Sequence, residues 1–247
     1  MGGLEAPEPY DVRWFPNRWP AMPGERCEVV LYTPQHDATF HSLGVERARR
    51  VVDLWAQRTA ALGERDDVHF VLCFENRGPE VGATIAHPHG QVYAYPHVPE
   101  RPRRLLDAAW SPDLEPGERL VAQHHGWIAS VQHAGTYPIA LSLAPVQQVP
   151  DLPSMSAAKR DGLAAMLVDV LARLDRLYDR PLPYMLWVNQ RPFDGGQWPH
   201  AWCNIEIVSP WRSAGVQRYI AAAEVACGEF FNPVVPEALA GQLRALA

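Results

Sequence analysis

Alternating apolar and polar residues predict the strands of this chain. Between residues 8 and 20, Tyr10, Val12 and Trp14 alternate with other side chains, and residues 27–33 are rich in β-forming residues. The same kind of pattern predicts further strands over residues 68–75, 87–95, 126–133, 137–145, 184–190 and 202–209.

Two long stretches carry apolar residues at helical spacing instead. Residues 43–62 form the first predicted helix, with Ser42 as its N-cap and Gly63 as its stop signal. Residues 156–178 form the second, and its apolar stripe consists of Leu163, Met166, Leu167, Val170, Leu174 and Leu177. Shorter helices are expected over residues 103–109, 215–226 and 236–245.

The order strand, strand, helix, strand, strand occurs twice along the chain. A repeated unit of this kind predicts an α+β fold made of two duplicated halves, with a mostly antiparallel sheet and helices packed on it. We expect the first half to span residues 8–110 and to carry the His-Pro-His-Gly-Gln run at residues 87–91. The second half is expected to span residues 111–247 and to end in a helical tail.

The composition argues against membrane and nucleic-acid partners. The formal charge of the 247 residues is -6, and the basic run at residues 101–104 is too short for a nucleic-acid surface. No apolar run approaches the roughly 18–20 residues that span a bilayer. Residues 1–7 lack the basic start and the apolar core of a signal peptide. Four widely spaced cysteines without a CxxC pair are typical of reduced, structural cysteines, so we expect a cytoplasmic protein.

The most informative run is residues 87–91, which places two imidazoles, a proline, a glycine and an amide together. On a strand, His87, His89 and Gln91 share one face. A histidine nucleophile needs one free ring nitrogen and an acceptor for the proton on the other, and a backbone carbonyl near position 87 could be that acceptor. Gln91 could donate to a phosphoryl oxygen, and Gly90 would let a phosphate come close.

The preceding turn adds two more candidates, because Gly82 and Thr84 could supply further hydrogen-bond donors. The spacing alone leaves three interpretations of the two histidines open. They form a nucleophilic site, half of a metal site, or an ordinary structural pair.

Several runs of the chain resemble the galactose-1-phosphate uridylyltransferase family of the histidine triad superfamily. The resemblance is carried by residues 74–78, 81–84 and 87–91, and it extends to residues 15–18, 32–37 and 232–237. It spans most of the chain and is strongest over residues 8–100. It implies that the two predicted halves are histidine-triad-like.

The resemblance implies a two-step, ping-pong exchange of UMP between UDP-glucose and galactose 1-phosphate. His89 would be the nucleophile that becomes uridylylated, and Gln91 would hydrogen-bond the transferred phosphoryl group. Phosphoryl transfer depends mostly on positioning and charge stabilisation, so the chemistry requires no cofactor.

The resemblance also implies a set of substrate-binding residues. Asn17 and Asn76 match positions that contact the nucleotide and its phosphates. Thr84 replaces a serine-type donor to the sugar phosphate. The residues that match the positions holding the hexose phosphate are Arg218, Tyr219 and Glu224.

The metal sites of the family are incomplete in this chain. A structural zinc would need an N-terminal cysteine pair besides His36 and His87, and two ligands cannot complete a tetrahedral site. Either zinc is absent, or other side chains replace the cysteines, or Met1 is a late start; we favour the first and the last. An iron-type site would need histidines at positions where this chain has Asn189, Trp202 and Asn204, so no iron is expected.

Two other functions remain as alternatives. The departures from the family pattern favour a related nucleotidyl enzyme, which would be a transferase, phosphorylase or hydrolase with a different nucleotide or sugar phosphate. A non-catalytic nucleotide-binding module is the third interpretation, although binding alone does not demand a nucleophile such as His89. The expected partners are a UDP-sugar and a sugar 1-phosphate, and family analogy suggests a homodimer.

Overall fold

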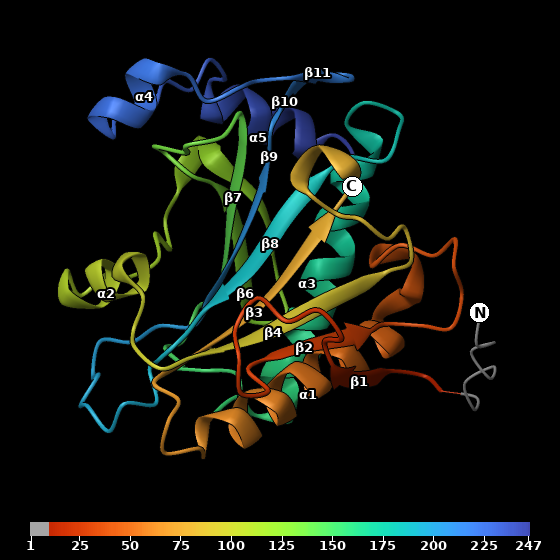
Figure 1. Ribbon diagram of the computed structural model, residues 1–247. Coiled ribbons are helices and arrows are strands. Elements are labelled where there is room, and N and C mark those ends of the chain that lie inside the picture. Colours follow the sequence, from red (N-terminus) through yellow and green to blue (C-terminus); the bar gives the residue numbers. More distant parts are fainter. Residues whose placement is uncertain (1–9) are drawn as a thin grey trace.

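In the computed structural model, which describes residues 10–247, nine strands form one antiparallel sheet (Figure 1). Their order is β1-β2-β4-β3-β8-β9-β7-β6-β5, so the earlier and later parts of the chain meet where β3 lies beside β8. The earlier strands are β1 (Arg13–Pro16), β2 (Cys27–Leu31), β3 (Phe70–Arg77) and β4 (His89–Tyr95). The later strands are β5 (Leu120–His124), β6 (Trp127–Val131), β7 (Ile139–Pro145), β8 (Tyr184–Asn189) and β9 (Asn204–Ser209).

The helices α1 (Gly44–Gly63), α3 (Ala157–Arg176) and α5 (Pro236–Arg244) join the sheet in one hydrophobic core. The shorter elements are α2 (Glu100–Asp107), α4 (Ala222–Cys227), η1 (His41–Leu43), η2 (Pro79–Val81) and η3 (Gly117–Arg119). Figure 1 shows α2 and α4 at the left and the upper left of the view, away from α1 and α3. Within residues 10–247 no helix combines the length and the apolar character needed to cross a membrane.

Alternation along β4 separates a core face of the sheet from an open face. Gly90, Val92 and Ala94 are buried, whereas His89 and Gln91 are partly exposed. Val92 and Ala94 belong to the core that α1 and α3 complete. Because successive side chains of a strand point to opposite faces, His89 and Gln91 point away from these helices.

The register at the centre of the sheet relates the two parts of the chain. Phe74 of β3 pairs with Gln91 on one side and with Trp187 of β8 on the other, and Trp187 pairs in turn with Glu206 of β9. The pairing pattern is therefore symmetric about the β3–β8 contact. Phe74 corresponds to Trp187, and Gln91 corresponds to Glu206. The expected α+β class, with its mostly antiparallel sheet, is confirmed, while the boundary near residue 110 stays a prediction.

The structure differs from the predicted elements mainly at the edges of the sheet. The strand expected over residues 8–20 is reduced to β1, which ends at Pro16, and residues 8 and 9 lie outside the described part. The edge strand β5 was not predicted. The helix expected from residue 215 begins only at Ala222, because β10 (Trp211–Ser213) and β11 (Val216–Gln217) form a ribbon around Gly215. Gly215 has a φ of 69°, which a right-handed helix cannot accommodate.

Candidate functional site

The imidazole of His89 is held by the backbone just before its own strand. Its Nδ1 atom lies 2.8 Å from the carbonyl oxygen of His87, as the sequence predicted for a carbonyl near that position. A carbonyl oxygen can only accept, so Nδ1 carries the ring proton in this contact. The neutral ring therefore keeps a free lone pair on Nε2, which is the arrangement that a nucleophile requires.

Gln91 lies two residues further along the same face and contacts Asn17. The Nδ2 atom of Asn17 donates to Gln91 Oε1 over 3.4 Å. Asn17 is itself fixed, because its backbone N–H donates to the Cys27 carbonyl at 2.8 Å and its Oδ1 accepts from the Trp19 N–H at 2.9 Å. With its oxygen engaged, Gln91 presents its amide NH2 as the free donor. The structure thus brings two predicted nucleotide-site residues together from β4 and the β1–β2 turn.

A cleft of about 410 Å³ lies beside the His-Pro-His run. Its lining includes four predicted site residues, namely Asn76, Thr84, His87 and His89. Residues 38–40 form another part of the wall. The end of β3, with Glu75 and Arg77, the turn after β3 and Pro88 form the rest. Gly82 ends η2 with a φ of 86°, so it shapes this turn without lining the cleft. Asn17 and Gln91 are also outside the lining.

Gly90 has a different neighbour from the one expected. It lies on the core face, where a Cβ atom would overlap the hydroxyl of Tyr32 and come within 3.0 Å of the Phe74 carbonyl oxygen. The missing side chain makes room for a buried phenol, not for a phosphate. The sequence could not reveal this contact, because Tyr32 is 58 residues away along the chain (90 − 32).

His36 and His87 meet as the zinc pattern predicts, but without further ligands. Their Nδ1 atoms lie 3.0 Å apart and their rings are 4.6 Å apart between centroids. Burial lowers the pKa of His87, and the neighbouring imidazoles contribute in the same direction. In residues 10–247 no group of three His, Cys, Asp or Glu side chains could hold a metal. Two imidazoles alone do not fit a closed tetrahedral zinc site.

The three residues expected to hold the hexose phosphate lie elsewhere. Arg218 forms an ion pair with Glu224, which is buried and also accepts the backbone N–H groups of Ala221 (2.9 Å) and Phe231 (3.1 Å). Tyr219 is 75% exposed. None of the three lines the cleft beside His89. They belong to the segment around α4, at the upper left of Figure 1.

The later part of the chain carries a polar network in place of a histidine cluster. Asn189 donates to Asn204 Oδ1 at 2.9 Å and to Glu206 Oε1 at 2.8 Å. Glu206 also accepts two hydrogen bonds from Arg101, at 2.9 and 2.8 Å, and one from Gln132 at 3.0 Å. The sequence pointed to both asparagines but missed the glutamate and its partners. The alternation of Asn204 and Glu206 on one strand was the signal available.

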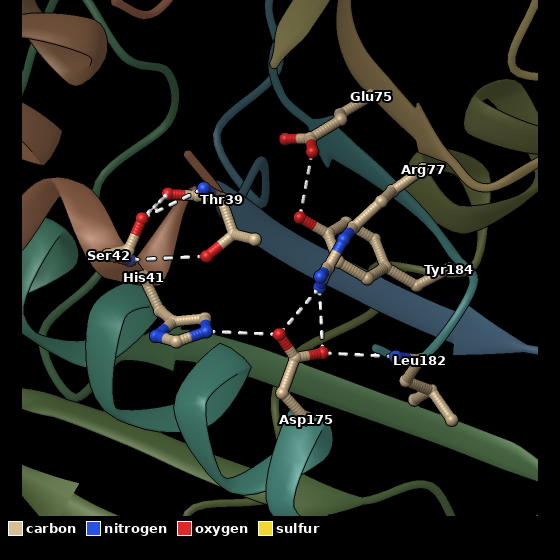
Figure 2. Close-up of polar contacts among 8 residues, drawn as sticks. All are labelled: Thr39, His41, Ser42, Glu75, Arg77, Asp175, Leu182 and Tyr184. Atoms are coloured by element: carbon tan, nitrogen blue, oxygen red, sulfur yellow. Dashed lines mark hydrogen bonds and ion pairs between the residues drawn. The ribbon is translucent and has the colours of Figure 1, made fainter. Parts of the chain in front are cut away.

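A polar cluster adjoins the cleft on the helix side of the sheet, and two of its members, Glu75 and Arg77, also line the cleft (Figure 2). The Tyr184 hydroxyl donates to Glu75 Oε1 at 2.7 Å. Next to it, Arg77 donates to both oxygens of Asp175 at 2.7 and 2.9 Å, and His41 lies 3.0 Å from the same carboxylate. Burial alone would raise the pKa of Asp175, but the hydrogen bonds from His41 and Arg77 outweigh it and hold this pKa below its usual range.

Glu75 makes the stability of the protein depend on pH. Burial raises the pKa of Glu75 from 4.5 to about 7, against the opposing effects of Tyr184 and Arg77. The folded state then binds more protons than the unfolded state between these two values, so its stability falls as the pH rises through them. The shift corresponds to a loss of about 3 kcal/mol.

A comparison of the wild type with Glu75→Gln isolates this effect, because the amide does not titrate. We expect the variant's stability relative to the wild type to increase by about 3 kcal/mol between roughly pH 4 and pH 8. Urea denaturation at a series of pH values measures it. A difference that does not change with pH would show that Glu75 titrates normally.

Comparisons with known proteins match one family over nearly the whole chain. Residues 19–99 match the family described as "Galactose-1-phosphate uridyl transferase, N-terminal domain", and residues 91–247 match the corresponding C-terminal domain. The galactose-1-phosphate uridylyltransferase of Thermotoga maritima is 32% identical, over 99% of this chain and 87% of the relative. The enzyme of that name from Streptomyces lividans is 38% identical, over 78% of this chain and 60% of the relative.

Solved structures share the fold. A structure described as a uridylyltransferase has a TM-score of 0.87 and 25% identity, and the match covers 99% of this chain and 87% of that one. An ADP-glucose phosphorylase from Arabidopsis thaliana with bound ADP-glucose has a TM-score of 0.85 over 96% and 82% of the two chains. At 19% identity, the latter shows likeness of fold alone.

Proposed function

Since the chain belongs to the galactose-1-phosphate uridylyltransferase family, we propose that it transfers a uridylyl group from UDP-glucose to galactose 1-phosphate. The observation that carries the proposal is the His89 ring, whose Nδ1 proton is held by the His87 carbonyl while Nε2 makes no hydrogen bond within residues 10–247. The chain spans 87% of one curated relative and only 60% of another.

The proposed reaction has two displacements at one phosphorus atom. In the first, the lone pair of His89 Nε2 attacks the α-phosphorus of UDP-glucose. An N–P bond forms, the bond from phosphorus to the bridging oxygen breaks, and glucose 1-phosphate leaves with the electron pair. In the second, a phosphate oxygen of galactose 1-phosphate attacks the same phosphorus, UDP-galactose forms and His89 regains its lone pair.

The His87 carbonyl stabilises the intermediate. Once Nε2 is bonded to phosphorus, the imidazole ring carries a positive charge. The hydrogen bond from Nδ1 to the carbonyl oxygen then becomes charge-assisted and therefore stronger than in the resting enzyme. This contact also keeps the ring oriented between the two steps, because its acceptor belongs to the backbone.

Neighbouring amides and hydroxyls hold the substrate in this proposal. Gln91 donates its free NH2 to a non-bridging phosphoryl oxygen, where charge is concentrated during transfer. Asn17 and Asn76 contact the nucleotide and its phosphates, and Thr84, on the wall of the cleft, donates to the sugar phosphate. Gly82 allows the tight turn that carries Thr84.

No step of this proposal passes through a metal. His36 and His87 are the two zinc-type side chains in place, and they leave a tetrahedral set incomplete among the described residues. At the position of the family's iron, Asn189 and Asn204 satisfy each other and Glu206 by hydrogen bonds. We propose that this position holds no iron, because neutral amides are poor ligands for it.

We also propose a homodimer in which the segment around α4 completes the partner's site. Arg218 and Glu224 are held together away from the cleft of their own chain. Apolar side chains crowd the same segment on its exposed surface: Tyr219, Val225, Phe231 and Val235. Exposed apolar groups that gather in this way are typical of a protein interface.

Complementation tests the dimer. His89→Ala protein and Arg218→Ala protein are each expected to be inactive, whereas a mixture that has exchanged subunits regains about a quarter of the wild-type activity by random pairing. Light scattering reports the mass of each sample. A monomeric mass, or a mixture that stays inactive after exchange, contradicts the shared site.

The transferase itself is tested by intact-mass measurement. The wild type is incubated with UDP-glucose, ADP-glucose or GDP-glucose in turn, and the mass of one nucleotidyl group is sought on the protein. We expect the adduct with UDP-glucose and its discharge by galactose 1-phosphate. Discharge by water or inorganic phosphate alone would assign a hydrolase or a phosphorylase instead, and UDP binding without an adduct would assign a non-catalytic module.

A further inference from the structure

Glu75 is a buried carboxyl whose role the proposed transfer does not explain. It is 4% exposed, and its Oε1 atom accepts from Tyr184. Its Oε2 atom is buried and has no hydrogen-bond partner among the described residues. Burying a carboxyl group is costly, and an apolar side chain would be cheaper at the same place. A function elsewhere in the site would explain why a carboxyl stands here.

Tyr32 is the second unsatisfied group of the cluster. Its ring is fully buried and packs edge-on against Phe40 and Trp55, with centroid distances of 5.4 and 6.0 Å. Its hydroxyl has no hydrogen-bond partner among the described residues. Burial and, next, the charge of Glu75 raise the pKa of Tyr32 well above its usual value, so the hydroxyl stays protonated and can donate to a neighbouring acceptor. The hydroxyl and the Glu75 carboxyl do not meet the geometry of a normal hydrogen bond in the structure.

Tyr32 contacts the backbone on both sides of the nucleophile. Its N–H donates to the carbonyl oxygen of Pro88 at 3.3 Å, and its hydroxyl fills the space that a side chain at Gly90 would occupy. The residue before it, Leu31, pairs with His89 itself in the sheet. A movement of the phenol toward Glu75 or away from it therefore changes the support beneath the strand that carries His89.

We propose that Glu75 is a positioning residue, which acts through the Tyr32 hydroxyl on the backbone at Gly90 and so sets the alignment of His89. The inference rests on the transfer reaction proposed above. In the ionised form, the two carboxylate oxygens accept one hydroxyl each, from Tyr184 and Tyr32, and the phenol is held in place. In the protonated form, one oxygen carries a hydrogen and the hold on Tyr32 weakens.

The surroundings make Glu75 the group that changes charge near neutral pH. Tyr32 and Tyr184 stay protonated, because burial raises the pKa of both. Burial also raises the pKa of Cys73 to about 12. Arg77 and Asp175 remain a charged pair, with His41 on the far side of Asp175. The pKa of Glu75, raised to about 7, lies above the lowered pKa of Asp175 and below the raised pKa values of Tyr32, Tyr184 and Cys73.

A double-mutant cycle tests the proposal in the full chain. Glu75→Gln leaves one acceptor oxygen in place of two, and Tyr32→Phe removes the hydroxyl. At saturating UDP-glucose, we expect each change to slow His89 nucleotidylation roughly 10-fold, as a small misplacement of a reacting atom does. UDP affinity should stay within about 2-fold, because neither side chain is proposed to touch the nucleotide.

The double variant should be no slower than the slower single variant, because both changes break the same link. The proposal would be overturned if the rate losses of the two single variants multiplied in the double variant. It would also be overturned if the single variants were as fast as the wild type. Tyr178→Phe is the matched control, since it removes a phenol hydroxyl beside Trp211 and outside the cluster. It should leave the rate unchanged.

The pH dependence supplies a readout that a purely structural role would not move. The ratio of the wild-type rate to the Glu75→Gln rate removes the pH effects that both proteins share. We expect this ratio to rise as the pH increases through about 7, where Glu75 ionises. A ratio that stays constant with pH would contradict control by the carboxylate.

A last measurement does not depend on turnover. The backbone amide resonance of Gly90, followed by NMR against pH, should show a step near 7 in the wild type. Both Glu75→Gln and Tyr32→Phe should remove this step. Its persistence in Tyr32→Phe would overturn the inference even in an active enzyme. If both variants lose the step but the wild type forms no nucleotidyl adduct, the connection from Glu75 through Tyr32 to Gly90 would be upheld. The proposed transfer reaction would then be refuted.

Discussion

His89→Ala protein is expected to form no nucleotidyl adduct and to lose at least about 10⁴-fold in the rate of exchange, because no other group in the cleft presents a free ring nitrogen held in this way. The cost is this large because the proposed route passes through a bond to His89 Nε2. Without that atom, the two sugar phosphates would have to displace one another directly. Intact mass after incubation with UDP-glucose measures the adduct, and labelled galactose 1-phosphate measures the exchange.

His97→Ala is the matched control for this loss. His97 follows β4 and is exposed, with its ring 5.9 Å from that of Tyr95, and it does not line the cleft. The variant should form the adduct at the wild-type rate. An adduct that survives in His89→Ala protein, or one that maps to another residue, would refute the assignment of the nucleophile.

Gly90→Ala is expected to destabilise the fold by about 3 kcal/mol, the upper range for overpacking a core. The new methyl group would overlap the Tyr32 hydroxyl and approach the Phe74 carbonyl oxygen within 3.0 Å. Tyr32 cannot move aside easily, because Phe40 and Trp55 enclose its ring. The strand would shift instead, and with it His89. Urea denaturation measures the stability, and the adduct rate measures the shift.

Two further variants test whether the overlap with Tyr32 causes the loss of stability in Gly90→Ala. Adding Tyr32→Phe to Gly90→Ala removes the overlapped oxygen and should restore part of the lost stability. Gly241→Ala places a methyl group in α5, where the nearest atom is a flexible Arg244 nitrogen at 3.7 Å, and should be neutral or slightly stabilising. If Gly90→Ala protein unfolds at the same urea concentration as the wild type, the packing argument is wrong.

Local sequence pattern predicted most of the fold, because strand and helix periodicities follow from short-range geometry. The alternation from residue 89 onward placed His89 and Gln91 on one face, as observed, but the strand begins at His89, so His87, which was expected on the same strand face, lies before it. The long helices were predicted nearly to their ends, at 44–63 and 157–176. The pattern failed at β5 and at the ribbon of β10 and β11, where short strands are stabilised by partners that local sequence does not specify.

The sequence by itself identified the family of the chain, because the family's motifs depend on residue types at fixed spacing. The contact of His89 with the His87 carbonyl is local and could be expected. The packing of Tyr32 against Gly90, with Glu75 behind it, was decided only by the tertiary structure. It joins the residue that follows β2 to β3 and β4, and contacts between segments distant in sequence depend on register and burial, which no local pattern encodes.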